Sequence, residues 1–161
     1  MKITKRVKIV KIITGGQTGV DRASLDAAIA LGVEHGGFCP QGRRSEDGII
    51  PLQYNMYELE TDDYLERTLK NVQFSDGTLI LYKGEIISGT RQTEKYCLLE
   101  KKPVLTINIL DECKKIRVTF NKWLEKNTIS ILNIAGPRES EASIYKRAKV
   151  MLMKLLIDHV L

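Results

Sequence analysis

The stretch ITGGQTGVDRASLDAAIALG, residues 13–32, decides the fold class of this chain. The apolar, β-branched run 7–14 predicts a buried strand, which stops at the paired glycines. After a polar turn, residues 21–31 place alanines and leucines densely enough for a helix packed on a sheet, and Gly32 ends that helix. A strand, a glycine-bearing turn and a helix in this order are typical of an α/β sheet.

Strand-like and helix-like segments alternate along the rest of the chain. Several strands are apolar on both faces, which is typical of a parallel sheet covered by helices on both sides. We therefore predict a single doubly wound, Rossmann-like α/β domain over residues 1–161, with a mostly parallel sheet. Further strands are predicted to end at Phe38 and to span 54–59, 78–82, 104–109 and 129–135. Further helices are predicted from Asp62, over 90–101, from Asp111 and over 144–155, with 40–51 as a loop.

Helical spacing predicts which faces of these helices are buried. The helix from Asp62 is expected to pack through Tyr64, Leu65, Leu69 and Val72. The helix after Asp111, which this residue is expected to cap, presents Ile116, Phe120, Trp123 and Leu124. The last helix presents Ile144, Ala148, Met151, Leu152 and Leu155.

Composition limits the classes of function. The 161 residues are 43% apolar and 28% charged, as in a globular protein with a sizeable core. The net charge of +5 arises from five basic residues within residues 1–11, and the remainder is neutral. Because no basic face elsewhere accompanies this segment, nucleic-acid binding is not expected. No apolar run approaches the roughly 18–20 residues that span a membrane, and the N-terminus lacks the apolar core of a signal peptide. We expect a cytoplasmic protein.

The cysteines and histidines indicate no metal site. Three cysteines are widely spaced and form no CxxC pair, and there are only two histidines. Cys97 and Cys113 fall at apolar helix positions and are expected to be buried. Cys39 lies near a polar loop, which leaves a buried side chain and a reactive thiol as alternatives. No catalytic residue and no metal ligand is predicted.

The turn GGQTGVDR after the first strand has the composition of an anion-binding loop. Its glycines allow positive φ angles and close approach of a ligand, and the following helix offers free N–H groups and a positive dipole end. The patterns GxGxxG and GxxxxGK[ST] are both absent, so a tight turn without a ligand stays an alternative. Asp21 is expected to cap the helix. The candidate binding residues here are Gly15, Gly16, Gln17, Thr18, Gly19, Asp21 and Arg22.

Three further turns add candidates at the ends of other predicted strands. In such sheets ligands bind beyond the carboxyl ends of the strands, where the strand order reverses. Arginine suits phosphate recognition, although the arginine pair near residue 43 is equally explained by a solvent-exposed loop of ion pairs. Ser88 and Thr90, the hydroxyl residues after the strand 78–82, are equally explained as caps of the next helix. These candidates are Arg43, Arg44, Ser88, Gly89, Thr90, Gly136 and Arg138.

The chain carries, in this order, the stretches GGQTGVDRASLDAA, GGFCPQGRRSEDG, ERTLKNVQFSDGTLIL, SGTRQT and LNIAGPRESE. Together they resemble the motifs of the molybdenum carrier family, from about residue 12 to residue 156. That family belongs to a Rossmann-like superfamily that also contains the LONELY GUY-type phosphoribohydrolases and the molybdenum cofactor carrier of green algae. The resemblance implies a cytoplasmic homo-oligomer, a dimer or a tetramer, that binds a phosphate-bearing small molecule. It implies that the ligand is the pterin molybdenum cofactor or a nucleotide.

The resemblance also implies that residues 15–19 form a first phosphate-facing loop and residues 88–90 a second. The hydrolases have a second loop of the form PGGxGTxxE, whose glutamate stands three residues after the threonine. Here Thr93 occupies that position, and Glu94 follows one residue later. A shift of one residue turns a side chain by about 100° around a helix, so Glu94 is expected to point away from the site.

A binding or carrier protein is the leading functional prediction, because it needs no tuned acid, base or nucleophile. The alternative is an enzyme that hydrolyses the N-glycosidic bond of a nucleotide. That reaction would require Asp21, Asp47 or Glu94 as its acid–base group. A nucleotide sensor that uses the same site is a third possibility.

Overall fold

The computed structural model describes residues 6–160, so residues 1–5 of the basic N-terminal segment lie outside the described part. Fifteen elements follow one another in the part that is described. The strands are β1 (Lys11–Ile13), β2 (Glu34–Cys39), β3 (Arg44–Ser45), β4 (Gly48–Ile49), β5 (Met56–Glu58), β6 (Gly77–Tyr82), β7 (Val104–Asn108) and β8 (Ile131–Ala135). The helices are α1 (Val20–Leu31), the 3₁₀ turn η1 (Gln41–Arg43), α2 (Tyr64–Gln73), α3 (Ser88–Leu99), α4 (Cys113–Asn127), α5 (Glu139–Ala142) and α6 (Tyr145–Val160).

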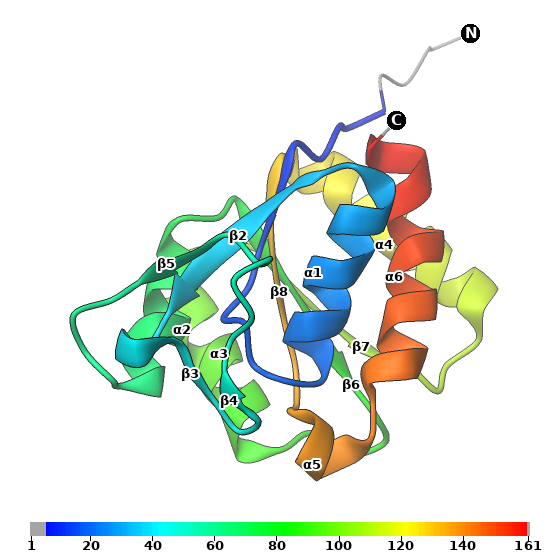
Figure 1. Cartoon of the computed structure of the whole chain (residues 1–161). Helices are drawn as coiled ribbons and strands as arrows, with labels where there is room; N and C mark the ends of the chain where they lie inside the picture. Colours follow the sequence, from blue (N-terminus) through cyan, green and yellow to red (C-terminus); the bar gives the residue numbers. More distant parts are fainter. Residues whose placement is uncertain (1–5, 161) are drawn as a thin grey trace, which may run out of the picture.

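Six strands form one sheet in the order β5-β2-β1-β8-β6-β7 (Figure 1). All neighbouring pairs are parallel, with Ile12 opposite Leu132 and Thr78 opposite Asn133 at the centre. The last strand of the chain, β8, thus lies between β1 and β6. The doubly wound α/β prediction is confirmed.

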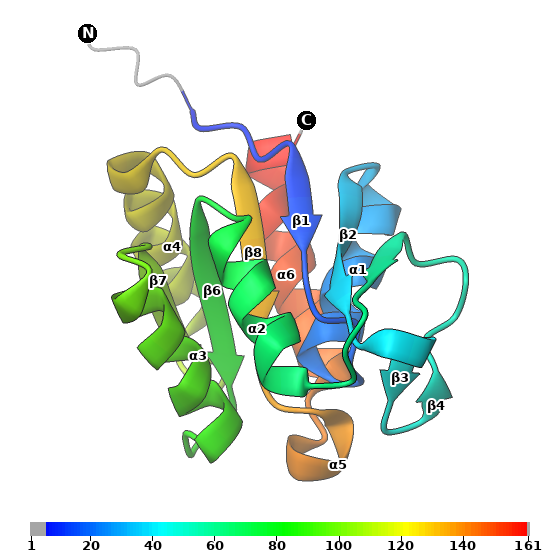
Figure 2. The ribbon, with the colours of Figure 1, turned by 90° about the vertical axis from the view of Figure 1, so that its left-hand side faces the viewer.

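Helices cover both faces of the sheet. Figure 2 shows α2 and α3 in front of it and α1, α4 and α6 behind it. Between these helices, β6 is buried over nearly its whole length. The side chains predicted for the last helix are all buried, and so are Ile116, Phe120 and Leu124 of α4. On α2, by contrast, Leu65 is exposed, so that part of the prediction was wrong.

Several element boundaries differ from the predicted ones. The strand β1 has only three residues, and two residues before it the amide of Ile9 donates to the carbonyl of His159 in α6. The helix α2 is capped by Asp63 and not by Asp62, and the residue before α4 is Glu112 and not Asp111. The predicted loop 40–51 contains η1 and the antiparallel β3–β4 hairpin.

The topology brings three glycine-bearing turns to one place. They follow β1, β8 and β6, which are neighbours in the sheet, and parallel strands end at the same edge. The connection after β1 runs to one side of the sheet, and the connection after β6 runs to the other. Within residues 6–160, no helix is both long enough and apolar enough to cross a membrane.

Candidate functional site

A cavity of about 210 Å³ lies at this edge of the sheet. Its wall comes from the turns after β1 and β8, from the first turn of α3 and from one face of α2. Polar side chains predominate among the residues that could contact a ligand. They are Gln17, Asp21, Tyr64, Arg67, Thr68, Asn71, Thr90, Gln92, Thr93, Asn133, Arg138 and Glu141.

The first turn, residues 15–19, depends on glycine for conformation and for close packing. Gly16 and Gly19 have φ angles of 75° and 77°, which favour glycine. A Cβ atom on Gly19 would overlap the carbonyl oxygen of Pro137, so the turns after β1 and β8 touch there. A Cβ atom on Gly15 would overlap the guanidinium of Arg67.

The backbone N–H groups of this turn are largely engaged within the protein. The amide of Gly16 donates to Thr14 Oγ1 at 3.0 Å, and that of Gln17 donates to Asp21 Oδ2 at 3.1 Å. The amide of Thr18 donates to the side-chain oxygen of Gln17 at 3.1 Å. Asp21 therefore does not cap α1, whose N-cap residue is Gly19 without a side-chain hydrogen bond. Instead its carboxylate holds the turn.

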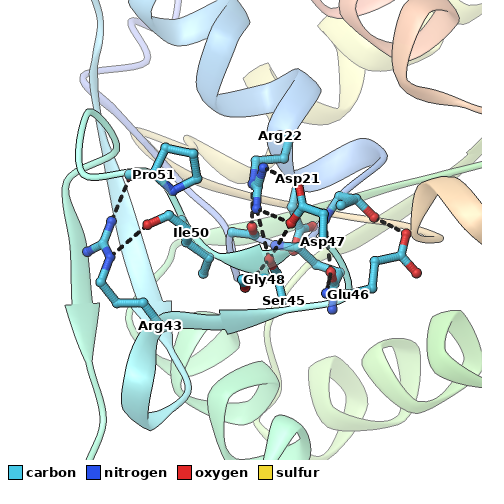
Figure 3. A network of polar contacts seen from close by, with 12 residues as sticks. Asp21, Arg22, Arg43, Ser45, Glu46, Asp47, Gly48, Ile50 and Pro51 are labelled. Atoms are coloured by element: carbon cyan, nitrogen blue, oxygen red, sulfur yellow. Dashed lines mark hydrogen bonds and ion pairs between the residues drawn. The ribbon is translucent and has the colours of Figure 1, made fainter.

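The tip of the β3–β4 hairpin is bonded to the same turn (Figure 3). Glu46 accepts hydrogen bonds from the hydroxyl of Thr18 and from both the amide and the hydroxyl of Ser140. Its own amide donates to Gln17 Oε1 at 2.9 Å. Desolvation acts to raise the pKa of Glu46, but the hydrogen bonds from Ser140 and Thr18 outweigh it and lower the pKa. A carboxylate of the protein thus joins the turn after β1 to α5.

Three of the predicted arginines have partners outside the cavity. Arg22 is buried and donates to Gly16 O at 2.7 Å and to Asp47 at 2.9 and 3.1 Å. Arg43 donates to backbone carbonyls, among them that of Ile50 at 3.0 Å (Figure 3). Arg44 forms an exposed ion pair with Asp62 at 3.1 Å. These contacts hold the segment 40–51 in place.

The most deeply buried charge in the cavity is an ion pair between α2 and α1. Arg67 and Asp21 form an ion pair of 3.4 Å, and their side chains are only 12% and 8% exposed. Burial raises the pKa of Asp21 to about 6, although the guanidinium of Arg67 and the amide of Gln17 act to lower it. A carboxyl with a pKa so far from its ordinary value is typical of a functional site.

The face of α2 toward the cavity carries polar residues that sequence reasoning missed. Tyr64, Arg67, Thr68 and Asn71 stand at positions i, i+3, i+4 and i+7 of this helix and line the cavity together. Asn71 bonds both backbone polar groups of Phe38 at 2.8 and 3.0 Å. The signal in the sequence is a polar stripe at helical spacing, of which Arg67, Thr68 and Asn71 fall within one of the quoted motifs. Such a stripe normally indicates a solvent-exposed face.

The N-terminus of α3 opens onto the cavity. Ser88 starts this helix and is exposed, whereas Gly89 and Thr90 line the cavity. First-turn N–H groups of a helix have no acceptor within the helix. Glu94 bonds Thr106 Oγ1 at 2.8 Å and does not line the cavity, as the one-residue shift predicts.

The turn after β8 contributes Gly136 and Arg138. The guanidinium of Arg138 lies 5.8 Å from the ring centre of Tyr64 and pairs with Glu141 at 2.9 Å. Glu139 accepts from the amides of Ile144 and Tyr145 at 3.0 and 2.8 Å and so caps the start of α6. Arg138 therefore has a partner and still faces the cavity.

Two buried polar atoms on residues that line this cavity lack a partner. Across residues 6–160, the buried side-chain N and O atoms without a hydrogen bond are Nε2 of Gln17 and Oγ1 of Thr90. These residues are 6% and 3% exposed, and both line the cavity. An unpaired buried donor costs about 1–3 kcal/mol, so a ligand that bonds both atoms would remove that cost.

The alternative of a reactive thiol at Cys39 is not supported. This residue ends β2, is fully buried and does not line the cavity. Burial also raises the pKa of its thiol, which disfavours the reactive thiolate. Over the part of the chain that the structure describes, no group of three His, Cys, Asp or Glu residues could hold a metal ion.

The structure divides the predicted binding residues into two sets. The residues that line the cavity are Gly15, Gln17, Asp21, Gly89, Thr90, Gly136 and Arg138. The others shape the turn or the hairpin, or lie at the surface: Gly16, Thr18, Gly19, Arg22, Arg43, Arg44 and Ser88.

This parallel sheet, with helices on both faces and a polar cavity at the carboxyl ends of its central strands, defines a protein of the Rossmann-like class. Residues 12–156 match the Circularly permutated YpsA SLOG family, and the chain belongs to that family. A permutation accounts for the central position of the last strand. If the chain began with β8, the next strands β1, β2 and β5 would extend the sheet on one side of β8. The strands β6 and β7 would then extend it on the other side.

The fold is also very similar to a crystal structure at 1.45 Å, that of the "Putative molybdenum carrier protein" from Syntrophus aciditrophicus SB. The two chains are 40% identical, with a TM-score of 0.91 over 95% of this chain and 98% of the other. No curated protein matches the sequence.

Proposed function

We propose that this protein is a small-molecule carrier that binds the phosphate-bearing end of a pterin or nucleotide-like ligand in the cavity between α2 and α3. The observation that carries the proposal is the pair of unpartnered buried atoms, Gln17 Nε2 and Thr90 Oγ1. Two arginines that line the same cavity, Arg67 and Arg138, carry positive charge. Charge-assisted hydrogen bonds from arginine are the strong contacts of phosphate recognition.

The molybdenum cofactor is the ligand that the relative's name favours. A cavity of about 210 Å³ is smaller than the roughly 300–1,000 Å³ of sites that enclose a drug-sized ligand. It would therefore take the phosphate end of the cofactor and leave the pterin nearer the surface. The lining residues include no cysteine or histidine, so the contacts would be to the organic part and not to the metal.

The first experiment is native mass spectrometry of freshly purified full-length protein, with metal analysis of the same sample. A bound molybdopterin mass with stoichiometric molybdenum is the expected result. A nucleotide mass without molybdenum would overturn the cofactor assignment and keep the anion site. Protein that carries neither ligand and binds neither on addition would overturn the proposal.

Thr90→Val tests the site without disturbing the fold. The change removes a hydroxyl that has no partner, so the free energy of unfolding should stay the same or rise slightly. The occupancy by the co-purified ligand should fall. Thr106→Val is the matched control, because Thr106 bonds Glu94 outside the cavity.

The hydrolase alternative is favoured by one observation, the pKa of Asp21. Of the three carboxyls that could serve such an enzyme, Asp47 pairs with Arg22 and Glu94 bonds Thr106, while Asp21 lines the cavity. Release of ribose 5-phosphate from AMP, lost in Asp21→Asn, would establish this activity. Protein that leaves AMP intact would exclude it for this substrate.

Self-association and a cytoplasmic location also remain proposals. On α3, Leu98 and Leu99 are 72% and 66% exposed, which offers an apolar surface for a second copy. Sedimentation equilibrium of the purified protein would distinguish a monomer from the proposed dimer or tetramer.

A further inference from the structure

The ion pair between Arg67 and Asp21 is unusually loose for a buried one. Arg67 Nη1 lies 3.4 Å from Asp21 Oδ2, and its Nε lies 3.4 Å from the carbonyl oxygen of Tyr64. A guanidinium carries five N–H donors, and a buried arginine commonly makes a bidentate pair with a carboxylate. Both contacts are long, so most of the hydrogen-bonding capacity of Arg67 is available to a group in the cavity.

The surroundings hold the guanidinium at the entrance to the turn 15–19. It occupies the space that a side chain at position 15 would need, because Gly15 has no Cβ. It also lies 5.3 Å from the ring centre of Tyr64. Burial lowers the pKa of Arg67, because the charged guanidinium loses its hydration. A second anionic partner would therefore stabilise the charged form. The unpartnered Gln17 Nε2 and Thr90 Oγ1 line the same cavity.

We infer that Arg67 exchanges partners when the ligand binds: the anionic group replaces the Asp21 carboxylate, which takes up a proton from solvent. This rests on the proposed function, since it requires an anionic ligand in this cavity. The ligand thereby gains a bidentate arginine, and the carboxylate becomes a neutral carboxylic acid. No other covalent change is involved.

The electrostatics around Asp21 support the proton uptake. Its carboxylate faces Arg67 from α2, the backbone amides of Gly15 and Gln17, and Arg22 of its own helix. Arg22 is already bonded to Asp47, and Arg138 near Arg67 is paired with Glu141. Burial has raised the pKa of Asp21 to about 6 even with Arg67 beside it. Loss of that cation and arrival of an anion would both raise it further.

The direction of the pH dependence follows. At pH 7 Asp21 is mostly ionised in the free protein and protonated in the complex, so binding consumes a proton. Affinity should fall as the pH rises above about 6, by up to tenfold per pH unit. Well below pH 6 the carboxyl is already protonated, and affinity should not depend on pH.

Sulfate is the probe for the test, because this anion does not itself titrate between pH 5 and pH 8. Isothermal titration calorimetry at pH 7, in two buffers of different ionisation enthalpy, measures the protons taken up. We expect uptake approaching one proton for the wild type and none for Asp21→Asn, which should bind sulfate up to about a hundredfold more tightly than the wild type at pH 8. Asp62→Asn, which removes an exposed carboxylate paired with Arg44, should behave as the wild type.

A second variant and a second measurement keep the inference testable if Asp21→Asn does not fold. Arg67→Lys keeps the charge but loses the bidentate geometry, and it should weaken sulfate binding more than tenfold. In the wild type, carboxyl NMR titration should show the pKa of Asp21 rising from about 6 when sulfate is added.

The outcomes separate this inference from the proposed function. Sulfate binding without proton uptake, or binding that Arg67→Lys leaves unchanged, would overturn the partner exchange while the anion site stands. No sulfate binding at any pH, in a protein that also carries no phosphate-containing ligand, would overturn both.

Discussion

The two walls of the cavity differ in how their polar groups are satisfied. The hairpin-side wall is the turn 15–19, which the β3–β4 hairpin supports from outside the cavity, and most amides, hydroxyls and carboxylates of the turn and the hairpin bond one another. The helix-side wall consists of the cavity-facing residues of α2 and α3. It contains the loosely paired Arg67 and the unpartnered hydroxyl of Thr90. The wall with the more conspicuous glycine motif is therefore largely bonded within the protein and offers Gln17 Nε2 to a ligand, whereas the other wall offers Arg67 and Thr90 Oγ1.

This difference separates two uses of glycine-rich turns. At the hairpin-side wall, glycine lets two segments of the chain pack together, as Gly19 does against Pro137. At the helix-side wall, a Cβ on Gly89 would meet no atom within 4 Å. Glycine there leaves room beside the first turn of α3. Substitutions at the two positions should consequently have opposite effects.

Gly19→Ala should have the largest effect on stability. The residue has a φ of 77° and a ψ of −125°, and the new Cβ would overlap backbone atoms of Pro137 and Arg138. Backbone strain and this overlap together should cost about 3 kcal/mol of unfolding free energy. Urea unfolding measures it. A loss below about 1 kcal/mol would mean that the turns after β1 and β8 are not packed as described.

Arg22→Met should lower the unfolding free energy by about 2 kcal/mol, since it removes buried hydrogen bonds from a charged group to Gly16 O and Asp47. Arg44→Met is the matched control. Its ion pair with Asp62 is exposed, so its loss should cost less than about 0.5 kcal/mol. Equal losses in the two variants would contradict the view that Arg22 holds the hairpin in place.

The sequence predicted the sheet, the helices and the three turns, because these depend on local patterns. It also predicted that Glu94 points away from the site, since a one-residue shift on a helix has a definite angular effect. It did not identify Arg67, because a polar stripe on a helix indicates solvent unless the packing buries it. The bonding of Glu46 to Thr18 was equally hidden, since it depends on how a distant hairpin folds back. Strand order, which places β8 at the centre, does not follow from the alternation of elements.

Glu46→Gln should weaken the hairpin-side wall in a pH-dependent way. The pKa of Glu46 is lowered in the folded protein, so its carboxylate stabilises the fold above the ordinary pKa of glutamate, about 4.3. That advantage over the variant should disappear as the pH falls through the lower pKa of the folded state. Because Glu46 is exposed, the effect at pH 7 should be less than about 1 kcal/mol.

Thermal unfolding between pH 3 and pH 7 measures this dependence, with Glu125→Gln on the exposed face of α4 as the control. The melting temperatures of the wild type and of Glu46→Gln should converge toward pH 3. A constant difference across this range would show that the charge of Glu46 does not contribute to the hairpin contact.

Gly89→Ala should have the smallest effect on stability and still reduce ligand binding. Alanine is a better helix former than glycine, and the new Cβ has free space, so unfolding free energy should rise by about 0.5 kcal/mol. The same methyl group would project beside the first-turn amides of α3, where the anion is proposed to bind. Native mass spectrometry should then show lower occupancy than in the wild type, although the protein is at least as stable. Unchanged occupancy would mean that the ligand does not contact α3. The loosely paired Arg67 of α2 would then be the remaining difference between the helix-side wall and the hairpin-side wall.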